Sequence, residues 1–84
     1  MNFLYILKSQ VKSWHYIGIT TDIANRLAKH NNGDVKSTKP YRPFSVVHTE
    51  SFSLKSDSRK REIFLKKNAR ARKELFENFN ASIV

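Results

Sequence analysis

The sequence predicts one α+β domain in which a three-stranded antiparallel sheet is flanked by about three helices, in the order ββαβαα. Three observations predict this fold: two apolar segments joined by a short polar loop, a later segment rich in β-branched and aromatic residues, and three stretches bounded by helix-start or helix-stop signals. The 84 residues suffice for one small domain. We assign the domain to residues 1–79 and a C-terminal tail to 80–84.

Two strands form the N-terminal part of the predicted sheet. Residues 2–8 are apolar on both faces, which predicts a central strand covered on both sides. After a polar loop at 9–13, residues 14–20 form a second strand, in which Tyr16 and Gly18 share one face. The short loop favours an antiparallel hairpin.

The first predicted helix begins after Thr21 or Asp22, either of which can cap it, and ends at Gly33. A polar connection at 33–43 follows. Residues 44–52 then have the β-branched and aromatic composition of a third strand.

Two further helices complete the predicted fold. One begins at Ser56 or Asp57 and ends at about Lys67, and the other covers about 70–78. Asn68 is positioned to cap the last helix.

The chain is strongly basic. Sixteen Lys and Arg residues against seven Asp and Glu residues give a formal net charge of +9. Nine basic and two acidic residues lie between Lys55 and Lys73, so this segment alone carries a net charge of +7. Such a balance favours nucleic acid as the partner. A solvated helix face is the alternative, whereas a membrane-surface helix would need a wider apolar stripe.

Composition excludes several classes of protein. Because the chain has no cysteine, disulfides, thiolate metal sites and cysteine nucleophiles are excluded. No apolar run approaches the roughly 18 residues of a membrane span. Residues 1–7 lack the basic flank and the cleavage site of a signal peptide, so we expect a soluble cytoplasmic protein.

Two tyrosines and a glycine are the most informative motif. Tyr5 lies in the first predicted strand and Tyr16 in the second, so a hairpin can bring both phenols to one groove. There a phenol can position or deprotonate a water molecule, although cross-strand packing is the ordinary role of a strand tyrosine. Gly18 either forms a β-bulge or keeps the groove free of a side chain.

Arg26 and His30 are four residues apart on the first predicted helix and therefore share a face. Arg26 can clamp a phosphate and stabilise the charge of a pentacovalent transition state. His30 can bind the phosphate or relay a proton. A surface ion pair between Asp22 and Arg26 is the alternative.

Glu62 is one of only two acids inside the +7 segment, the other being Asp57. One carboxylate can hold a hard divalent ion if water and a substrate phosphate complete the shell, an arrangement that Mg²⁺ tolerates. The ion would stabilise the leaving oxygen during hydrolysis. An ion pair with Lys66 is the alternative.

Other basic and hydroxyl side chains are candidates for contacts with backbone phosphates. The predicted nucleic-acid contacts are Thr38, Lys39, Arg42, Arg59, Lys66, Lys67 and Arg70.

In order and spacing these residues resemble the GIY-YIG nuclease superfamily, above all its small single-domain members of the UPF0213 type and the N-terminal nuclease domain of UvrC. Phe3-Leu4-Tyr5 stands where the family has Gly-Ile-Tyr, and Tyr16-Ile17-Gly18 is complete. Arg26, His30 and Glu62 follow in family order. The resemblance extends from the first motif to about residue 73.

The resemblance implies the GIY-YIG endonuclease fold and one divalent ion, Mg²⁺ or Mn²⁺, bound by Glu62. It also implies that both tyrosines act on the reacting water and that Arg26 and His30 bind the phosphate. We expect Tyr5 to be the base and Tyr16 to orient the water.

Two departures from the family pattern concern the C-terminal part. Glu74 stands where some members have an asparagine, which puts one substrate contact in doubt. Ala69 replaces a serine helix cap, so Asn68 takes that role.

The preferred hypothesis is a metal-dependent endonuclease that cuts phosphodiester bonds of DNA, with structure-specific cleavage in repair or recombination as its expected setting. A non-catalytic nucleic-acid-binding module on the same scaffold is the alternative. We expect a monomer or homodimer, without a membrane role. Nucleic-acid structure, dimerisation or a protein partner would supply specificity.

Overall fold

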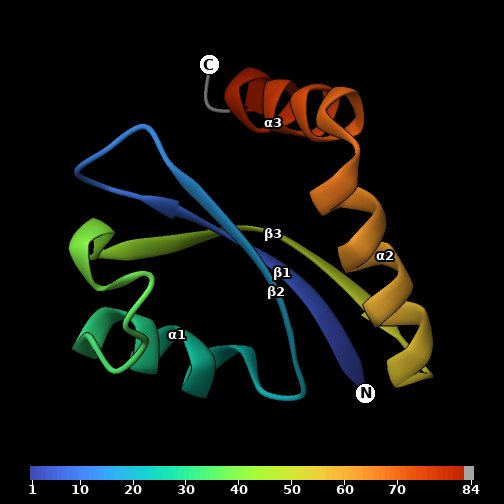
Figure 1. Cartoon of the computed structure of the whole chain (residues 1–84), viewed down its shortest axis with the longest axis horizontal. Coiled ribbons are helices and arrows are strands. Elements are labelled where there is room, and N and C mark those ends of the chain that lie inside the picture. Colours follow the sequence, from blue (N-terminus) through green and yellow to red (C-terminus); the bar gives the residue numbers. More distant parts are fainter. Residues whose placement is uncertain (83–84) are drawn as a thin grey trace.

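A computed structural model describes the backbone of residues 1–82 and the side chains of residues 1–79. Within residues 1–82, three strands and three α-helices follow in the predicted order, with one additional 3₁₀ helix (Figure 1). The elements are β1 (Asn2–Ser9), β2 (His15–Thr20), α1 (Ile23–Asn32), η1 (Lys39–Tyr41), β3 (Phe44–Phe52), α2 (Lys55–Lys67) and α3 (Ala69–Ser82). The predicted fold class is confirmed. The end of the predicted tail, 83–84, lies outside the described residues.

The three strands form an antiparallel sheet in the order β2-β1-β3. β1 is therefore central, as its two apolar faces predicted. The pairing of β1 with β2 is regular across Tyr5 and Gly18. The register shift lies instead between Ile6 and Leu7, on the side of β3. The β-bulge considered for Gly18 is thus absent from this strand pair.

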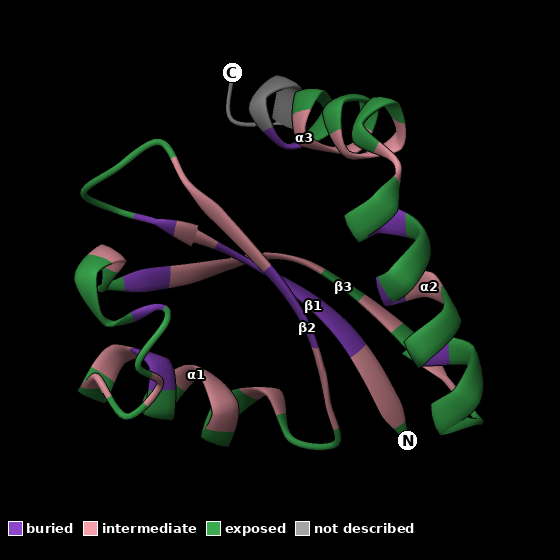
Figure 2. Ribbon diagram, in the orientation of Figure 1, coloured by how far each residue is buried: buried purple, intermediate pink, exposed green. Residues whose placement is uncertain are grey.

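Helices cover both faces of the sheet (Figure 1). Alternate residues of β1 point in opposite directions, so Leu4 and Ile6 pack with α2 and α3, whereas Tyr5 and Leu7 pack with α1. Burial accordingly concentrates along β1 (Figure 2). This alternation places Tyr5 on the side of the sheet from which α1 presents its side chains.

Local capping explains the helix ends. Asp22 Oδ1 accepts a hydrogen bond from Asn25 N (3.0 Å) at the start of α1, and Gly33, with φ of 83°, ends that helix. Asn68 Oδ1 accepts one from Ala71 N (2.9 Å), so the predicted cap of α3 is confirmed. α2 begins at Lys55, slightly earlier than predicted. No helix within residues 1–82 is long and apolar enough to cross a membrane.

The polar connection between α1 and β3 folds back onto the hairpin. It contains η1, which the sequence did not predict. Trp14 stacks on Tyr41, with ring centroids 4.1 Å apart. Ser9 Oγ also donates a hydrogen bond to Tyr41 O (2.5 Å). These contacts bring residue 38, at the start of η1, close to α1.

Candidate active site

Gly18 makes room for the phenol of Tyr5. A Cβ atom at residue 18 would lie 2.7 Å from the Tyr5 hydroxyl oxygen and 2.9 Å from Cε2 of Tyr16. The two tyrosine ring centroids are 6.1 Å apart. Any side chain at residue 18 would therefore displace one ring or the other. The glycine preserves the arrangement of the two tyrosines.

The Tyr5 hydroxyl joins the sheet to α1. It contacts His30 Nε2 at 3.0 Å and accepts a hydrogen bond from Arg26 Nε at 3.4 Å. Among the described residues, no ion pair of 4 Å or less joins Asp22 and Arg26. Three of the predicted site residues are thus assembled around one oxygen atom.

Burial separates the roles that the two tyrosines can take. Tyr5 is 1% exposed, and this desolvation raises its pKa to about 12 despite the hydrogen bond from Arg26. Its phenol therefore stays protonated at neutral pH. Tyr16 is only half-buried and lines a small hollow of about 240 Å³. Tyr16 is therefore the more exposed of the two tyrosines.

His30 is fully buried behind the tyrosines. Its Nδ1 lies 2.8 Å from Thr38 Oγ1, and its ring centroid lies 4.8 Å from that of Tyr16. Desolvation, together with the charge of Arg26, lowers the pKa of His30. The imidazole is therefore neutral at pH 7.

Thr38 corrects one expectation. We expected it to contact backbone phosphates, but its side chain is fully buried, and its hydroxyl is bonded to His30 and to Val35 O. It has no access to a nucleic acid. It supports the site from behind.

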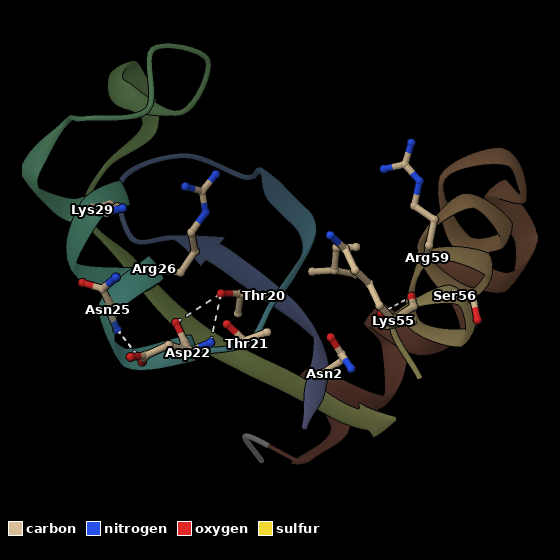
Figure 3. Close-up of a pocket in the computed structure, with 12 residues that line it drawn as sticks. Asn2, Thr20, Thr21, Asp22, Asn25, Arg26, Lys29, Lys55, Ser56 and Arg59 are labelled. Atoms are coloured by element: carbon tan, nitrogen blue, oxygen red, sulfur yellow. Dashed lines mark hydrogen bonds between the residues drawn. The ribbon is translucent and has the colours of Figure 1, made fainter. Parts of the chain in front are cut away.

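A cleft of about 840 Å³ lies between α1 and the first turns of α2 (Figure 3). Arg26 stands on one wall and Arg59 on the other, with Thr20 of β2 between them. Four of its lining residues are cationic and one is acidic. The lining residues are Asn2, Ile19, Thr20, Thr21, Asp22, Asn25, Arg26, Lys29, Lys55, Ser56, Ser58 and Arg59.

Glu62 faces the sheet from α2 and is 6% exposed. Its Oε1 accepts a hydrogen bond from Arg59 Nη1 (3.2 Å) and its Oε2 one from Lys66 Nζ (3.1 Å). The ion pair with Lys66 that the sequence left open is thus present. Within the described residues no hydrogen bond or ion pair joins Glu62 to Tyr5 or Arg26, so the structure does not bring all five predicted catalytic residues into direct contact.

The two cations that pair with Glu62 nevertheless line the cleft and the small hollow. Arg59 lines the larger cleft together with Thr20, and Lys66 lines the small hollow together with Tyr16. Glu62 pairs with both of these cations, and α2 contacts β2, so the carboxylate is linked through its two partners to both hollows.

Glu62 suits a metal ion that needs few protein ligands. Within residues 1–82 no group of three or more histidines and carboxylates could hold a metal ion. A single buried carboxylate fits a hard divalent ion whose other ligands are water and phosphate oxygens. Both cations that now neutralise Glu62 are on long, exposed side chains, which can move aside.

The remaining predicted nucleic-acid contacts are exposed but lie away from the cleft lining. Arg42 Nη1 donates a hydrogen bond to Asn32 O at the end of α1 (3.1 Å), and Arg70 pairs with Glu74 (3.4 Å). Lys39 and Lys67 are exposed.

Lys29 and Lys55, by contrast, line the cleft although the sequence did not single them out. Lys29 follows Arg26 by three residues on a helix, and this spacing places both on one face. That spacing was the signal that could have identified Lys29.

Comparison with known proteins points to one family. The model of the GIY-YIG catalytic domain matches residues 1–75. The chain is 40% identical over 76 residues to the UPF0213 protein YazA of Bacillus subtilis, covering 89% of this chain and 76% of that protein. It is 40% identical over 75 residues to the UPF0213 protein VNG_2274C of Halobacterium salinarum, covering 88% and 96% respectively.

A solved structure supports the same relationship. The solution NMR structure of the UPF0213 protein BH0048 from Bacillus halodurans superposes with a TM-score of 0.56 at 34% sequence identity. The match covers 93% of this chain and 84% of that chain. The names of these three relatives state no activity.

Proposed function

The chain belongs to the GIY-YIG family, and on that premise we propose that it is a metal-dependent endonuclease that hydrolyses phosphodiester bonds of DNA. One observation carries the proposal. The hydroxyl of Tyr5 joins the buried His30 to Arg26, and Arg26 lines a strongly cationic cleft. Such an arrangement is suited to a phosphate group and to the charge that grows on it during hydrolysis.

The cleft suits the backbone of a nucleic acid rather than its bases. Cations on both walls can pair with successive phosphates, and the hydroxyl and amide side chains between them can donate hydrogen bonds to phosphate oxygens. The only acid in the lining, Asp22, uses one carboxylate oxygen to cap α1. Contacts of this kind position a strand without reading its sequence, so we expect weak sequence specificity.

Arg26 is the residue to which we assign the scissile phosphate. Its Nε donates a hydrogen bond to the Tyr5 hydroxyl, so the terminal guanidinium nitrogens remain on the cleft side. Holding the side chain at Nε fixes its direction before substrate binds, which increases its benefit in the transition state.

The contacts favour the reverse of our assignment of the two tyrosines. Tyr5 is buried, protonated and bonded to two partners, so we propose that it anchors Arg26 and His30. Tyr16 is half-buried and the more exposed of the two, so we assign the attacking water to Tyr16.

Glu62 is the residue that would hold Mg²⁺ or Mn²⁺. When bound, the ion supplies Lewis-acid stabilisation of the leaving oxygen. Arg59 and Lys66 keep the carboxylate ionised and oriented until the ion and the phosphate arrive.

Cleavage of a panel of substrates tests the proposal. The panel contains supercoiled plasmid, single-stranded DNA, flap DNA and RNA. Each substrate is incubated with the unmodified chain (the parent), with Glu62→Gln or with Glu74→Gln, in the presence of Mg²⁺ or Mn²⁺. We expect the parent to nick DNA, Glu62→Gln to lose at least about 100-fold in rate, and Glu74→Gln, an exposed control, to match the parent. Cleavage by Glu62→Gln at the parent rate contradicts the proposal.

A non-catalytic nucleic-acid-binding module remains the competing function because Glu62 is already neutralised by two cations. The same panel separates the two. A parent chain that binds DNA but cuts none of the substrates, with either metal, supports the binding module.

A further inference from the structure

Thr38 is a buried polar residue to which the proposed mechanism gives no role. It lies between α1 and η1 and is fully buried. Its Oγ1 lies 2.8 Å from His30 Nδ1 and donates a hydrogen bond to Val35 O at 3.2 Å. A buried hydroxyl with two such partners can fix the direction of a hydrogen-bond chain.

The direction of the chain follows from the single proton of the Thr38 hydroxyl. Because Oγ1 gives that proton to Val35 O, the contact with His30 needs a hydrogen from Nδ1. The neutral ring then carries its lone pair on Nε2, which accepts the hydrogen of the Tyr5 hydroxyl at 3.0 Å. All hydrogen atoms in this chain point from Tyr5 towards Val35.

The direction of these hydrogen bonds also determines how the Tyr5 hydroxyl interacts with Arg26. With its hydrogen turned to His30, the Tyr5 oxygen presents lone pairs to the guanidinium, and Arg26 Nε donates to it at 3.4 Å. In the other tautomer, an Nε2–H would donate to the same oxygen and compete with Arg26. The tautomer of a fully buried histidine therefore affects an arginine at the cleft.

We propose that Thr38 is a positioning residue that holds His30 in its Nδ1–H tautomer and thereby keeps Tyr5 available as the acceptor for Arg26. For cleavage rates this proposal rests on the proposed function, whereas the tautomer itself does not. Thr38 touches neither the cleft nor the hollow beside Tyr16. Its influence acts through His30.

Nitrogen NMR of the imidazoles tests the proposal without any substrate. The chain has three histidines, so each ring of a ¹⁵N-labelled sample can be assigned individually. We expect the Nδ1–H form of His30 in the parent and in Thr38→Ser, which keeps the hydroxyl. Thr38→Val keeps the shape but leaves Nδ1–H without an acceptor, so its tautomer ratio should shift by about tenfold or more towards Nε2–H.

Cleavage kinetics provide the second measurement. We expect Thr38→Val to lower kcat roughly tenfold with little change in KM, since a misdirected Arg26 fails mainly in the transition state. Thr38→Ser and the exposed control Ser37→Ala should cut at the parent rate.

Two results would overturn the inference: an Nε2–H tautomer in the parent, or an unchanged Nδ1–H tautomer in Thr38→Val. If Thr38→Val does not fold, the parent spectrum still decides. A parent that cuts nothing but shows the Nδ1–H tautomer refutes the endonuclease and leaves the role of Thr38 intact.

Discussion

Tyr5 and Gly18 are paired across β1 and β2, and the space above Gly18 is filled by the Tyr5 phenol. A Cβ atom on residue 18 would approach the hydroxyl oxygen to 2.7 Å, closer than real Cβ contacts. The oxygen in question is the one that holds Arg26 and His30. The glycine of the second motif is thus linked to the arginine of α1 through one phenol.

Replacement of Gly18 by alanine should therefore damage the site and the core together. The added methyl group must push Tyr5 or Tyr16 aside, and overpacking of this kind costs about 1–3 kcal/mol of unfolding free energy. We expect lower stability in urea unfolding and a large loss of cleavage per folded molecule.

Gly33→Ala is the matched control. It is strained because Gly33 has φ of 83°, but a Cβ there would meet the flexible guanidinium of Arg42 and be in ordinary contact with Cγ of Lys39, without touching either tyrosine. This variant should lose stability yet keep the parent rate per folded molecule. If Gly18→Ala cleaves at the parent rate per folded molecule, Gly18 has no role in the arrangement of the site.

Stability should fall at high pH because of Tyr5. Burial raises the pKa of Tyr5 to about 12 from the 10.0 of an exposed tyrosine. The folded chain holds this proton more tightly, so its contribution is complete below pH 10 and is lost as pH rises towards 12. Two pKa units correspond to about 3 kcal/mol.

Urea unfolding at pH 9 and pH 11 measures this contribution. Tyr5→Phe should lose less stability between these pH values than the parent, whereas Tyr41→Phe should behave as the parent does. Lysine titration is common to all three proteins and cancels in the comparison. Equal pH dependence of the parent and Tyr5→Phe contradicts the prediction.

Arg61 should stabilise the packing of α2 against the sheet. It donates to both oxygens of Glu50 on β3, at 2.9 and 3.2 Å, and Glu50 also contacts His48 Nε2 at 2.7 Å. Burial alone would raise the pKa of Glu50, but the bonds from Arg61 and His48 lower it overall. This pair therefore joins α2 to β3 one residue before Glu62.

Arg61→Met should lose about 1–2 kcal/mol of unfolding free energy, as expected for a bidentate, partly buried pair. Arg70→Met provides the control, since Arg70 and Glu74 form a pair that is exposed to solvent, and it should change stability by less than about 0.5 kcal/mol. Thermal unfolding compares the two. Equal destabilisation would argue against a special role for Arg61.

The elements were predictable from the sequence because their signals are local. The capping carboxylate of Asp22, the left-handed Gly33 and the amide of Asn68 all act within a few residues. The apolar faces of β1 likewise depend only on alternation along the strand.

The roles within the site depend on distant contacts and were harder to predict. The residues around Thr38 form a polar loop, and this local sequence does not distinguish a solvent-exposed threonine from one that is bonded to a buried histidine. Its burial depends on the return of η1 to the hairpin, where Trp14 stacks on Tyr41. Tyr5 and Tyr16 likewise share one face of the sheet and differ in burial, since Tyr5 is on the central strand β1 and Tyr16 on the edge strand β2.

Binding of duplex DNA should depend on the cations of the cleft more than on cations elsewhere. Lys29 and Lys55 line the cleft from opposite walls, whereas Lys73 is an exposed residue of α3 that lines neither hollow. A cation that neutralises a phosphate releases a counterion, so its removal reduces the slope of log K against log salt by about 0.9. We expect this reduction for Lys29→Ala and Lys55→Ala and none for Lys73→Ala.

Fluorescence anisotropy with a labelled duplex, titrated at several salt concentrations in Ca²⁺, measures the slopes without requiring cleavage. None of these three lysines makes a side-chain hydrogen bond or ion pair among the contacts of the described residues, so a change in slope would report binding rather than unfolding. If Lys73→Ala alters the slope as much as Lys55→Ala does, the strand runs over α3 instead. The cleft beside Arg26 would then not be the site that binds the phosphate backbone.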